Sequence, residues 1–218
     1  MKIYIDSSDI KEIKEINKTK LVDGITTNPS LIAKQNKDIK TILKEICKEI
    51  KGPVSAEVTA EDCAGMLKEA QVLKKIAKNI VIKLPLTFDG LKACSELSKK
   101  KVKTNVTLCF SVTQALMAAK CGATYVSPFI GRLDDIGENG VDLINDIRKV
   151  FDNYKDLKTQ ILSASIRNID HVKEVAKAGS DIATIPAKVF HEMYKHDLTD
   201  KGLKLFLDDW KSTNQKIS

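Results

Sequence analysis

Three ionisable residues lie in apolar runs from which they could form one catalytic site. Lys83 lies in Val-Ile-Lys-Leu-Pro, Glu57 lies in Val-Ser-Ala-Glu-Val, and Asp6 ends the run Lys-Ile-Tyr-Ile-Asp. A lysine that is buried without a committed acidic partner is available as a neutral amine, which can attack a ketone and form an iminium. The two carboxylates can move the protons that this reaction needs. The pattern therefore predicts carbonyl chemistry through a lysine Schiff base.

Arginine is rare in this lysine-rich chain, and its positions indicate a phosphate site. Only three of the 36 Lys and Arg residues are arginine, and two of them, Arg132 and Arg167, follow two late apolar runs. The planar guanidinium group binds phosphate through paired hydrogen bonds. We expect these two arginines to bind a phosphate together with Ser165 and the amides near Asn168. The alternative is that they form surface ion pairs with Asp134, Asp135 or Asp170.

Eight short runs rich in β-branched residues alternate with amphipathic stretches along the chain. The runs are Lys2–Asp6, Gly24–Asn28, Val54–Val58, Ile80–Leu84, Lys103–Leu108, Tyr125–Phe129, Gln160–Ser165 and Asp181–Ile185. The helical stretches include Ala60–Lys78, Ser111–Lys120, Gly140–Asn153 and Asn168–Lys177. Strict alternation of strand and helix predicts an α/β fold with a parallel sheet. Eight units in 218 residues, with no Gly-x-Gly-x-x-Gly after the first strand, favour a closed (β/α)8 TIM barrel over an open doubly wound sheet.

We expect residues 1–218 to form one barrel domain, because no linker interrupts the pattern. The last part of the chain, about residues 200–211, has the pattern of an additional amphipathic helix. Such a helix could cover the barrel or a neighbouring subunit.

Side chains on a strand alternate between two faces, so every second residue of a barrel strand points into the barrel. Applied to the first seven runs, this rule places most polar residues inside. The expected inward set is Asp6, Thr26, Asn28, Glu57, Lys83, Asn105, Thr107, Ser127, Phe129, Ser163 and Ser165. These residues lie near the carboxyl ends of the strands, where barrel enzymes place their active sites. We therefore expect Asp6, Glu57 and Lys83 to meet in one pocket.

Composition excludes several other classes of function. The five cysteines show no pairing pattern and the three histidines lack metal-ligand spacing, so we expect reduced thiols, no metal and no cofactor. The net charge of +7 comes from lysines on helix faces with few aromatic residues nearby, so we expect no nucleic-acid partner. No apolar run approaches the roughly 20 residues of a membrane span, and we expect a soluble, cytosolic protein.

Six motifs in order carry a resemblance to a known family. They are Tyr-Ile-Asp-Ser-Ser from Tyr4, Thr-Thr-Asn-Pro-Ser from Thr26, Val-Ile-Lys-Leu-Pro from Val81, Asn-Val-Thr-Leu-Cys-Phe-Ser from Asn105, Ser-Pro-Phe-Ile-Gly-Arg from Ser127 and Ser-Ala-Ser-Ile-Arg-Asn from Ser163. Together they resemble transaldolase in its short bacterial form, a barrel of class I aldolase type. The resemblance implies transfer of a dihydroxyacetone unit from sedoheptulose 7-phosphate or fructose 6-phosphate to an aldose phosphate, in the non-oxidative pentose phosphate pathway.

The resemblance also assigns roles to individual residues. It implies that Lys83 forms the Schiff base, that Glu57 acts as acid and base through a water held by Thr107, and that Asp6 accepts the proton of the C4 hydroxyl. The residues that it assigns to substrate binding are Thr26, Asn28, Asn105, Ser127, Phe129, Arg132, Ser165 and Arg167. Short members of this family commonly form decamers, which implies a homo-oligomer.

Two alternatives remain at this stage. A close relative of the same fold, fructose 6-phosphate aldolase, releases free dihydroxyacetone and typically carries Gln and Tyr where this chain has Glu57 and Phe129. That difference favours the transferase. The non-enzymatic alternative is a barrel that only binds sugar phosphate.

Overall fold

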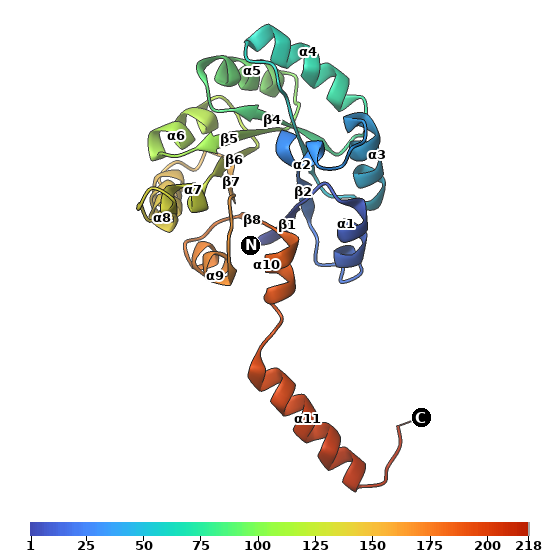
Figure 1. Cartoon of the computed structure of the whole chain (residues 1–218). Coiled ribbons are helices and arrows are strands. Elements are labelled where there is room, and N and C mark those ends of the chain that lie inside the picture. Colours follow the sequence, from blue (N-terminus) through green and yellow to red (C-terminus); the bar gives the residue numbers. More distant parts are fainter. Residues whose placement is uncertain (218) are drawn as a thin grey trace.

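Eight parallel strands close into a barrel in the computed structural model, which describes residues 1–217 (Figure 1). Each strand pairs with the next in sequence, and β8 pairs with β1. The strands are β1 (Lys2–Asp6), β2 (Gly24–Thr26), β3 (Val54–Glu57), β4 (Ile80–Pro85), β5 (Thr104–Cys109), β6 (Tyr125–Pro128), β7 (Gln160–Ser163) and β8 (Ile182–Ile185). The predicted (β/α)8 fold is confirmed.

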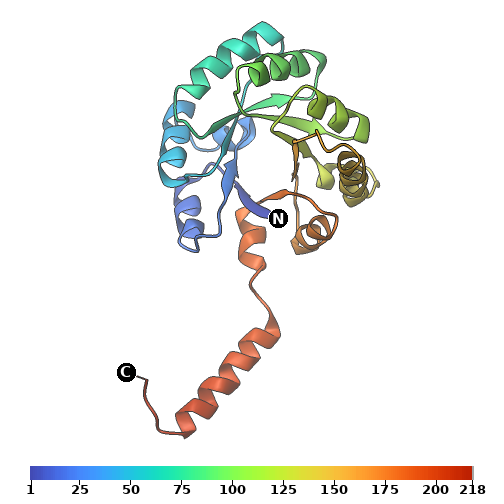
Figure 2. The same ribbon diagram turned by 180° about the vertical axis from the view of Figure 1, so that it is seen from behind.

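Helices surround the strands as an outer ring, and both views show the ring around the barrel (Figures 1 and 2). They are α1 (Ile10–Asn17), α2 (Pro29–Ala33), α3 (Ile39–Glu49), α4 (Cys63–Lys74), α5 (Phe88–Lys99), α6 (Val112–Lys120), α7 (Ile130–Asp134), α8 (Gly140–Asp152), α9 (Ile169–Lys177) and α10 (Ala187–Glu192). A further helix, α11 (Asp197–Ser212), lies outside the ring. Many begin at a polar cap: the side chains of Asp62, Ser111 and Asn168 accept backbone N–H groups of α4, α6 and α9.

Several elements begin or end one to four residues away from the predicted bounds. α4 begins after its cap Asp62 and ends at Lys74, so the predicted stretch Ala60–Lys78 was too long at both ends. α11 begins at Asp197 because the ring nitrogen of His196 caps it, so the last helix is longer than predicted. Strand β2 ends before Asn28, which caps α2.

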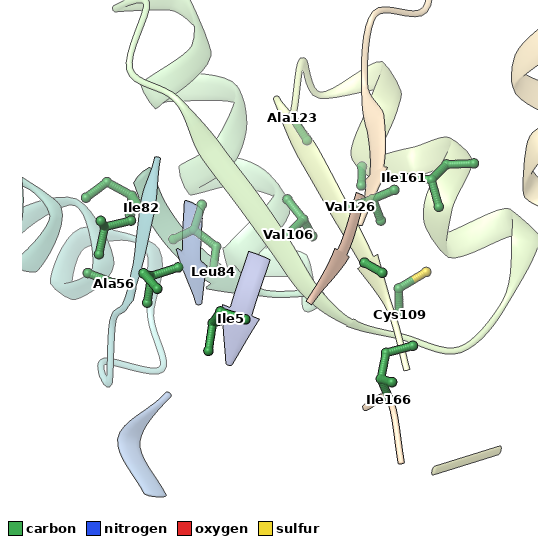
Figure 3. Close-up of a cluster of buried hydrophobic side chains, with 14 of the residues drawn as sticks. Ile5, Ala56, Ile82, Leu84, Val106, Cys109, Ala123, Val126, Ile161 and Ile166 are labelled. Carbon is green, nitrogen blue, oxygen red and sulfur yellow. The ribbon is translucent and has the colours of Figure 1, made fainter. Parts of the chain in front are cut away.

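Two apolar layers hold the barrel together. Inside the barrel, one cluster consists of Tyr4, Val81, Tyr125, Leu162 and Ile182. The larger layer lies between the strands and the helices, and Figure 3 shows part of it, including Ile5, Ala56, Ile82, Val106 and Ile161. On the inward face, the cavity residues Asp6, Lys83 and Thr184 each follow a residue of the inner cluster by two positions, so they lie above it, toward the carboxyl ends of the strands.

Strand β7 corrects one prediction about the inward set. Leu162 belongs to the cluster inside the barrel, whereas Ile161 belongs to the outer layer, so Ser163 faces the helices and not the interior. Its hydroxyl forms a hydrogen bond with that of Ser180 at 2.8 Å. A serine with a hydrogen-bond partner is readily buried on either face, so polarity alone misplaced it.

Helix α11 stands apart from the barrel in both views (Figures 1 and 2). None of its residues is buried, although its side chains include Leu203, Phe206 and Trp210, which are 57%, 71% and 40% exposed. Within residues 1–217, no helix has the length and apolar character needed to cross a membrane.

Candidate active site

A cavity of about 250 Å³ opens at the carboxyl ends of the strands. Its lining residues are Asp6, Thr26, Asn28, Lys83, Thr107, Ser127, Phe129, Arg132, Ala164, Ser165, Arg167 and Thr184. All except Ala164 and Thr184 were predicted as site residues from the sequence. Two other predicted residues, Glu57 and Asn105, do not line this cavity.

Lys83 is the buried cation of the site. Its side chain is 6% exposed, and its Nζ lies 2.8 Å from Oε2 of Glu57 and donates a hydrogen bond to the carbonyl of Thr27 at 3.2 Å. The expectation that Lys83 lacks a committed partner is therefore wrong. Glu57 and Lys83 are directly paired in the register of β3 and β4, so their side chains leave the sheet side by side on one face.

Glu57 approaches the lysine from outside the main cavity. Its side chain is 15% exposed, and it borders two other hollows of about 400 and 180 Å³ beside α2, α3 and α4. The carboxylate therefore contacts the amine through one oxygen, while its exposed part faces these hollows. Lys83 therefore lines the main cavity and also contacts the Glu57 side chain, which borders the other two hollows.

Asp6 lines the cavity as the second carboxylate. It accepts a hydrogen bond from Oγ1 of Thr26 at 2.6 Å. Burial raises the pKa of Asp6 above its ordinary value. The hydrogen bond from Thr26 and the positive charge of Lys83 oppose this rise, and the charge of Glu57 adds to it. Asp6 is therefore a carboxylate whose proton affinity is increased by its surroundings.

Strand β5 brings the hydroxyl of Thr107 to the cavity, where that hydroxyl forms no hydrogen bond with the described residues. The buried Oγ1 of Thr107 has no hydrogen-bond partner among the residues that the structure describes. The register of β5 against β6 shifts after Thr107, and Leu108 adopts a left-handed backbone conformation with φ of 62°. This bulge turns Leu108 outward, where it is 37% exposed, and leaves Thr107 directed into the cavity.

Amide side chains support the cavity from below and beside it. Ser127 donates to Oδ1 of Asn105 at 2.7 Å, and Nδ2 of Asn105 donates to Ser55 at 3.3 Å, so Asn105 is held within the barrel interior beneath Ser127. Asn28 uses Oδ1 to accept the backbone N–H of Leu31 at the start of α2. Its Nδ2 group consequently remains a donor for the cavity.

The arginine side of the cavity contains one paired and one unpaired guanidinium group. Nη2 of Arg167 lies 2.5 Å from Oδ2 of Asp135 and donates to the carbonyl of Gly131 at 3.2 Å. This contact is the surface ion pair that was the alternative to phosphate binding for Arg167. Arg132 has no carboxylate partner in the described part of the chain, and its guanidinium lies 5.9 Å from the ring centre of Phe129. Both arginines line the same cavity.

Ser165 reaches this side of the cavity through an uncommon backbone conformation. Its φ is 59°, in the left-handed region, immediately after β7 ends. An L-residue there costs about 1–2 kcal/mol, so the surrounding structure must hold it. Gly131 permits the close approach, because a Cβ at that position would lie 2.3 Å from the Ser165 carbonyl oxygen.

Thr184 is the polar cavity residue that the sequence reasoning missed. Its hydroxyl lies 2.6 Å from that of Thr26, and it follows Ile182 on the inward face of β8. The alternation rule that found the other strand residues would have found this one too.

Thiols and metal ligands contribute nothing visible to the cavity. The five cysteines are free, and burial raises the pKa of Cys109 to about 12 and that of Cys47 to about 11. Across residues 1–217, no group of three His, Cys, Asp or Glu side chains is placed to hold a metal ion.

Comparisons with known proteins agree on a family and on a fold. The family described as Transaldolase/Fructose-6-phosphate aldolase matches residues 3–217. Proteins named probable transaldolase from Bartonella bacilliformis, Rhizobium meliloti and Brucella anthropi are each 58% identical over 218 residues, covering 100% of both chains. A thiamine phosphate pyrophosphorylase from Pyrococcus furiosus has a TM-score of 0.60 at 15% identity, covering 88% of this chain and 93% of that one, and this likeness concerns the barrel fold alone.

The match to residues 3–217 agrees with a barrel whose cavity combines a buried lysine, the carboxylate of Asp6 and two arginines, with Glu57 paired to the lysine from outside the cavity. This chain is an enzyme, and it belongs to the transaldolase/fructose-6-phosphate aldolase family.

Proposed function

We propose that this enzyme is a transaldolase. It transfers a dihydroxyacetone unit from sedoheptulose 7-phosphate or fructose 6-phosphate to glyceraldehyde 3-phosphate or erythrose 4-phosphate, as a step of the non-oxidative pentose phosphate pathway. The observation that carries this proposal is the buried Lys83 amine, which lines the same cavity as Asp6 and two arginines. The names of the relatives support the same activity.

The first half-reaction forms and uses a Schiff base at Lys83. Once the Lys83 ammonium group has given a proton to the Glu57 carboxylate beside it, the neutral amine attacks C2 of the ketose, and loss of water from the carbinolamine gives an iminium. Asp6 takes the proton of the C4 hydroxyl as the C3–C4 bond breaks, and the bonding electrons move into the iminium to give an enamine. The shortened aldose phosphate leaves.

The second half-reaction reverses these steps with a new aldehyde. The enamine carbon attacks the acceptor aldehyde, the new alkoxide receives the proton from Asp6, and water then hydrolyses the iminium to release the product. Glu57 lies 2.8 Å from the amine and is the group that donates protons to, and accepts protons from, the lysine nitrogen and the carbinolamine oxygen. The free hydroxyl of Thr107 can hold the water that carries them.

The arginine side binds the phosphate, which fixes the sugar along the cavity. Arg132 has no competing carboxylate, whereas Arg167 must exchange its contact with Asp135 for the phosphate or share it. Ser165 supplies a further hydroxyl at the same end. Asn28 and Asn105 bind hydroxyls of the dihydroxyacetone unit, and Ser127 lines the same cavity and contacts Asn105.

Borohydride trapping tests the Schiff base directly. Wild-type protein incubated with fructose 6-phosphate and borohydride should gain a covalent adduct that peptide mass spectrometry locates at Lys83, and Lys83→Ala should gain none. Without an acceptor aldose, a transaldolase should release less than one dihydroxyacetone per site on the turnover time scale. Continuous release would instead assign the fructose 6-phosphate aldolase activity, and no adduct would leave only sugar phosphate binding.

We infer that the working form is a homo-oligomer in which α11 packs on another copy of the chain. The apolar side chains of Leu203, Phe206 and Trp210 are otherwise exposed to water, which is unfavourable for so many large residues on one helix. Sedimentation of the wild type against Phe206→Glu should show an assembly that weakens in the variant. A monomeric wild type would contradict the inference.

A further inference from the structure

Thr184 occupies the cavity wall in a position that the proposed mechanism leaves unused. It is 3% exposed, and its hydroxyl lies 2.6 Å from Oγ1 of Thr26, which itself lies 2.6 Å from Oδ1 of Asp6. The three residues come from β8, β2 and β1, which are neighbours around the barrel. A continuous chain of hydroxyls therefore ends on the carboxylate that is proposed to take the C4 hydroxyl proton.

The number of hydroxyl protons fixes the direction of this chain. An ionised Asp6 can only accept, so the single hydroxyl proton of Thr26 points to it, and Thr184 must donate to the oxygen of Thr26. A hydroxyl that donates to Oδ1 of Asp6 stabilises the negative charge of the ionised carboxylate more than it stabilises the neutral acid, so this direction of the chain favours the ionised form.

Both threonines lie on strands, where their geometry is closely defined. Thr26 is paired with Asp6 in the register of β1 and β2, and Thr184 is paired with Tyr4 in the register of β1 and β8. Threonine is β-branched, so few χ1 rotamers are open to either side chain. The hydroxyl chain is consequently a built part of the barrel wall and not a loop contact.

We propose that Thr184 is a positioning residue that, through Thr26, holds Asp6 ionised and oriented to accept the proton of the substrate hydroxyl. This inference rests on the proposed function and deepens the role of Asp6 in it. Hydrogen bonds in a chain strengthen one another, so a donor to Thr26 makes Thr26 a better donor to Asp6.

The other charged groups around Asp6 stay the same when Thr184 is changed. Lys83 favours the ionised form and Glu57 opposes it. Arg132 and Arg167 line the same cavity. Burial raises the pKa of Asp6, so the hydroxyl chain opposes a shift that would otherwise leave the group protonated at higher pH. A change confined to Thr184 isolates the contribution of its hydroxyl.

The test is the pH profile of kcat/KM for fructose 6-phosphate, with saturating erythrose 4-phosphate as the acceptor, in Thr184→Val, which keeps the side-chain shape and removes the hydroxyl. We expect the acidic limb to move to higher pH by about 0.3–1 unit and kcat to fall about 3- to 10-fold. KM should change less than twofold, since Thr184 acts through Thr26. Thr184→Ser should restore the wild-type limb.

A double-mutant comparison distinguishes an effect that Thr184 exerts through Thr26 from a local structural disturbance caused by the substitution. Thr26→Val should move the limb further than Thr184→Val, and the double variant should match Thr26→Val alone. The matched control is Ser180→Ala, which removes a buried hydroxyl pair with Ser163 outside the cavity. It should leave the limb where it is.

Three outcomes would overturn the inference: an unmoved limb in Thr184→Val, failure of serine to restore it, or additive shifts in the double variant. Borohydride trapping at Lys83 keeps this result apart from the proposed function. An adduct in wild type and in Thr184→Val with an unmoved limb would reject the role of Thr184 alone. No adduct in the wild type would reject the proposed function, and the inference with it.

Discussion

Replacing Glu57 by alanine should destabilise the fold more than replacing Lys83 by methionine, although both changes break the same ion pair. After Glu57→Ala, the lysine is left 6% exposed with only the carbonyl of Thr27 as its partner. After Lys83→Met, the carboxylate still borders two hollows that water can enter. The charge left behind is therefore better solvated in the second case.

The expected sizes follow from the cost of an unpaired buried charge. Removing one partner of a buried pair costs about 3–5 kcal/mol. We expect about 3 kcal/mol for Glu57→Ala and about 1 kcal/mol for Lys83→Met, which conserves volume. For a chain of this size these values lower Tm by about 6–12 °C and about 2–4 °C.

Calorimetric melting at equal protein concentration measures the difference, since assembly would make Tm depend on concentration. Glu57→Gln keeps an oxygen facing the amine and serves as the control, with an intermediate loss of stability. Equal losses in Glu57→Ala and Lys83→Met would refute the reasoning.

Three further predictions follow from the cavity. Burial raises the pKa of Asp6 in the folded state, so its negative charge disfavours folding at neutral pH. Asp6→Asn should therefore abolish turnover but raise Tm at pH 7–8, by the equivalent of about 0.5–2 kcal/mol, and this gain in stability should disappear toward pH 4. Arg132→Ala should lower kcat/KM for fructose 6-phosphate more than kcat/KM for fructose, by the equivalent of about 1.5–3 kcal/mol. An equal loss for both sugars would exclude a contact between Arg132 and the phosphate. Gly131→Ala should lower the free energy of unfolding by about 1–3 kcal/mol and raise KM for phosphorylated substrates, because the new methyl group would collide with the Ser165 carbonyl and with Arg167. Unchanged kinetics would contradict this prediction.

Much of the barrel could be predicted because strands and helices leave different periods in the sequence. Alternation along single strands correctly directed Asp6, Lys83 and Thr107 into the cavity. The rule depends only on the two-residue repeat of a strand, which is local. It failed for Ser163, because a small hydroxyl can be satisfied on either face and carries little information about which face is inside.

Partners across the barrel could not be read from the sequence. The pairing of Glu57 with Lys83 depends on the register of two strands whose residues are distant in sequence. The contact of Arg167 with Asp135 depends on how two loops meet, and the placement of Asn105 beneath Ser127 depends on their depth in the barrel.

The sequence by itself determined the fold class, the family motifs and the kinds of chemical group that reach the active end of the barrel. Only the tertiary structure decided which of those groups touch: Lys83 with Glu57, and Thr26 with both Thr184 and Asp6. The physical reason is that residue type and periodicity act within one element. Hydrogen bonds and ion pairs need distances near 3 Å, and those are set only when strands pair and the barrel closes.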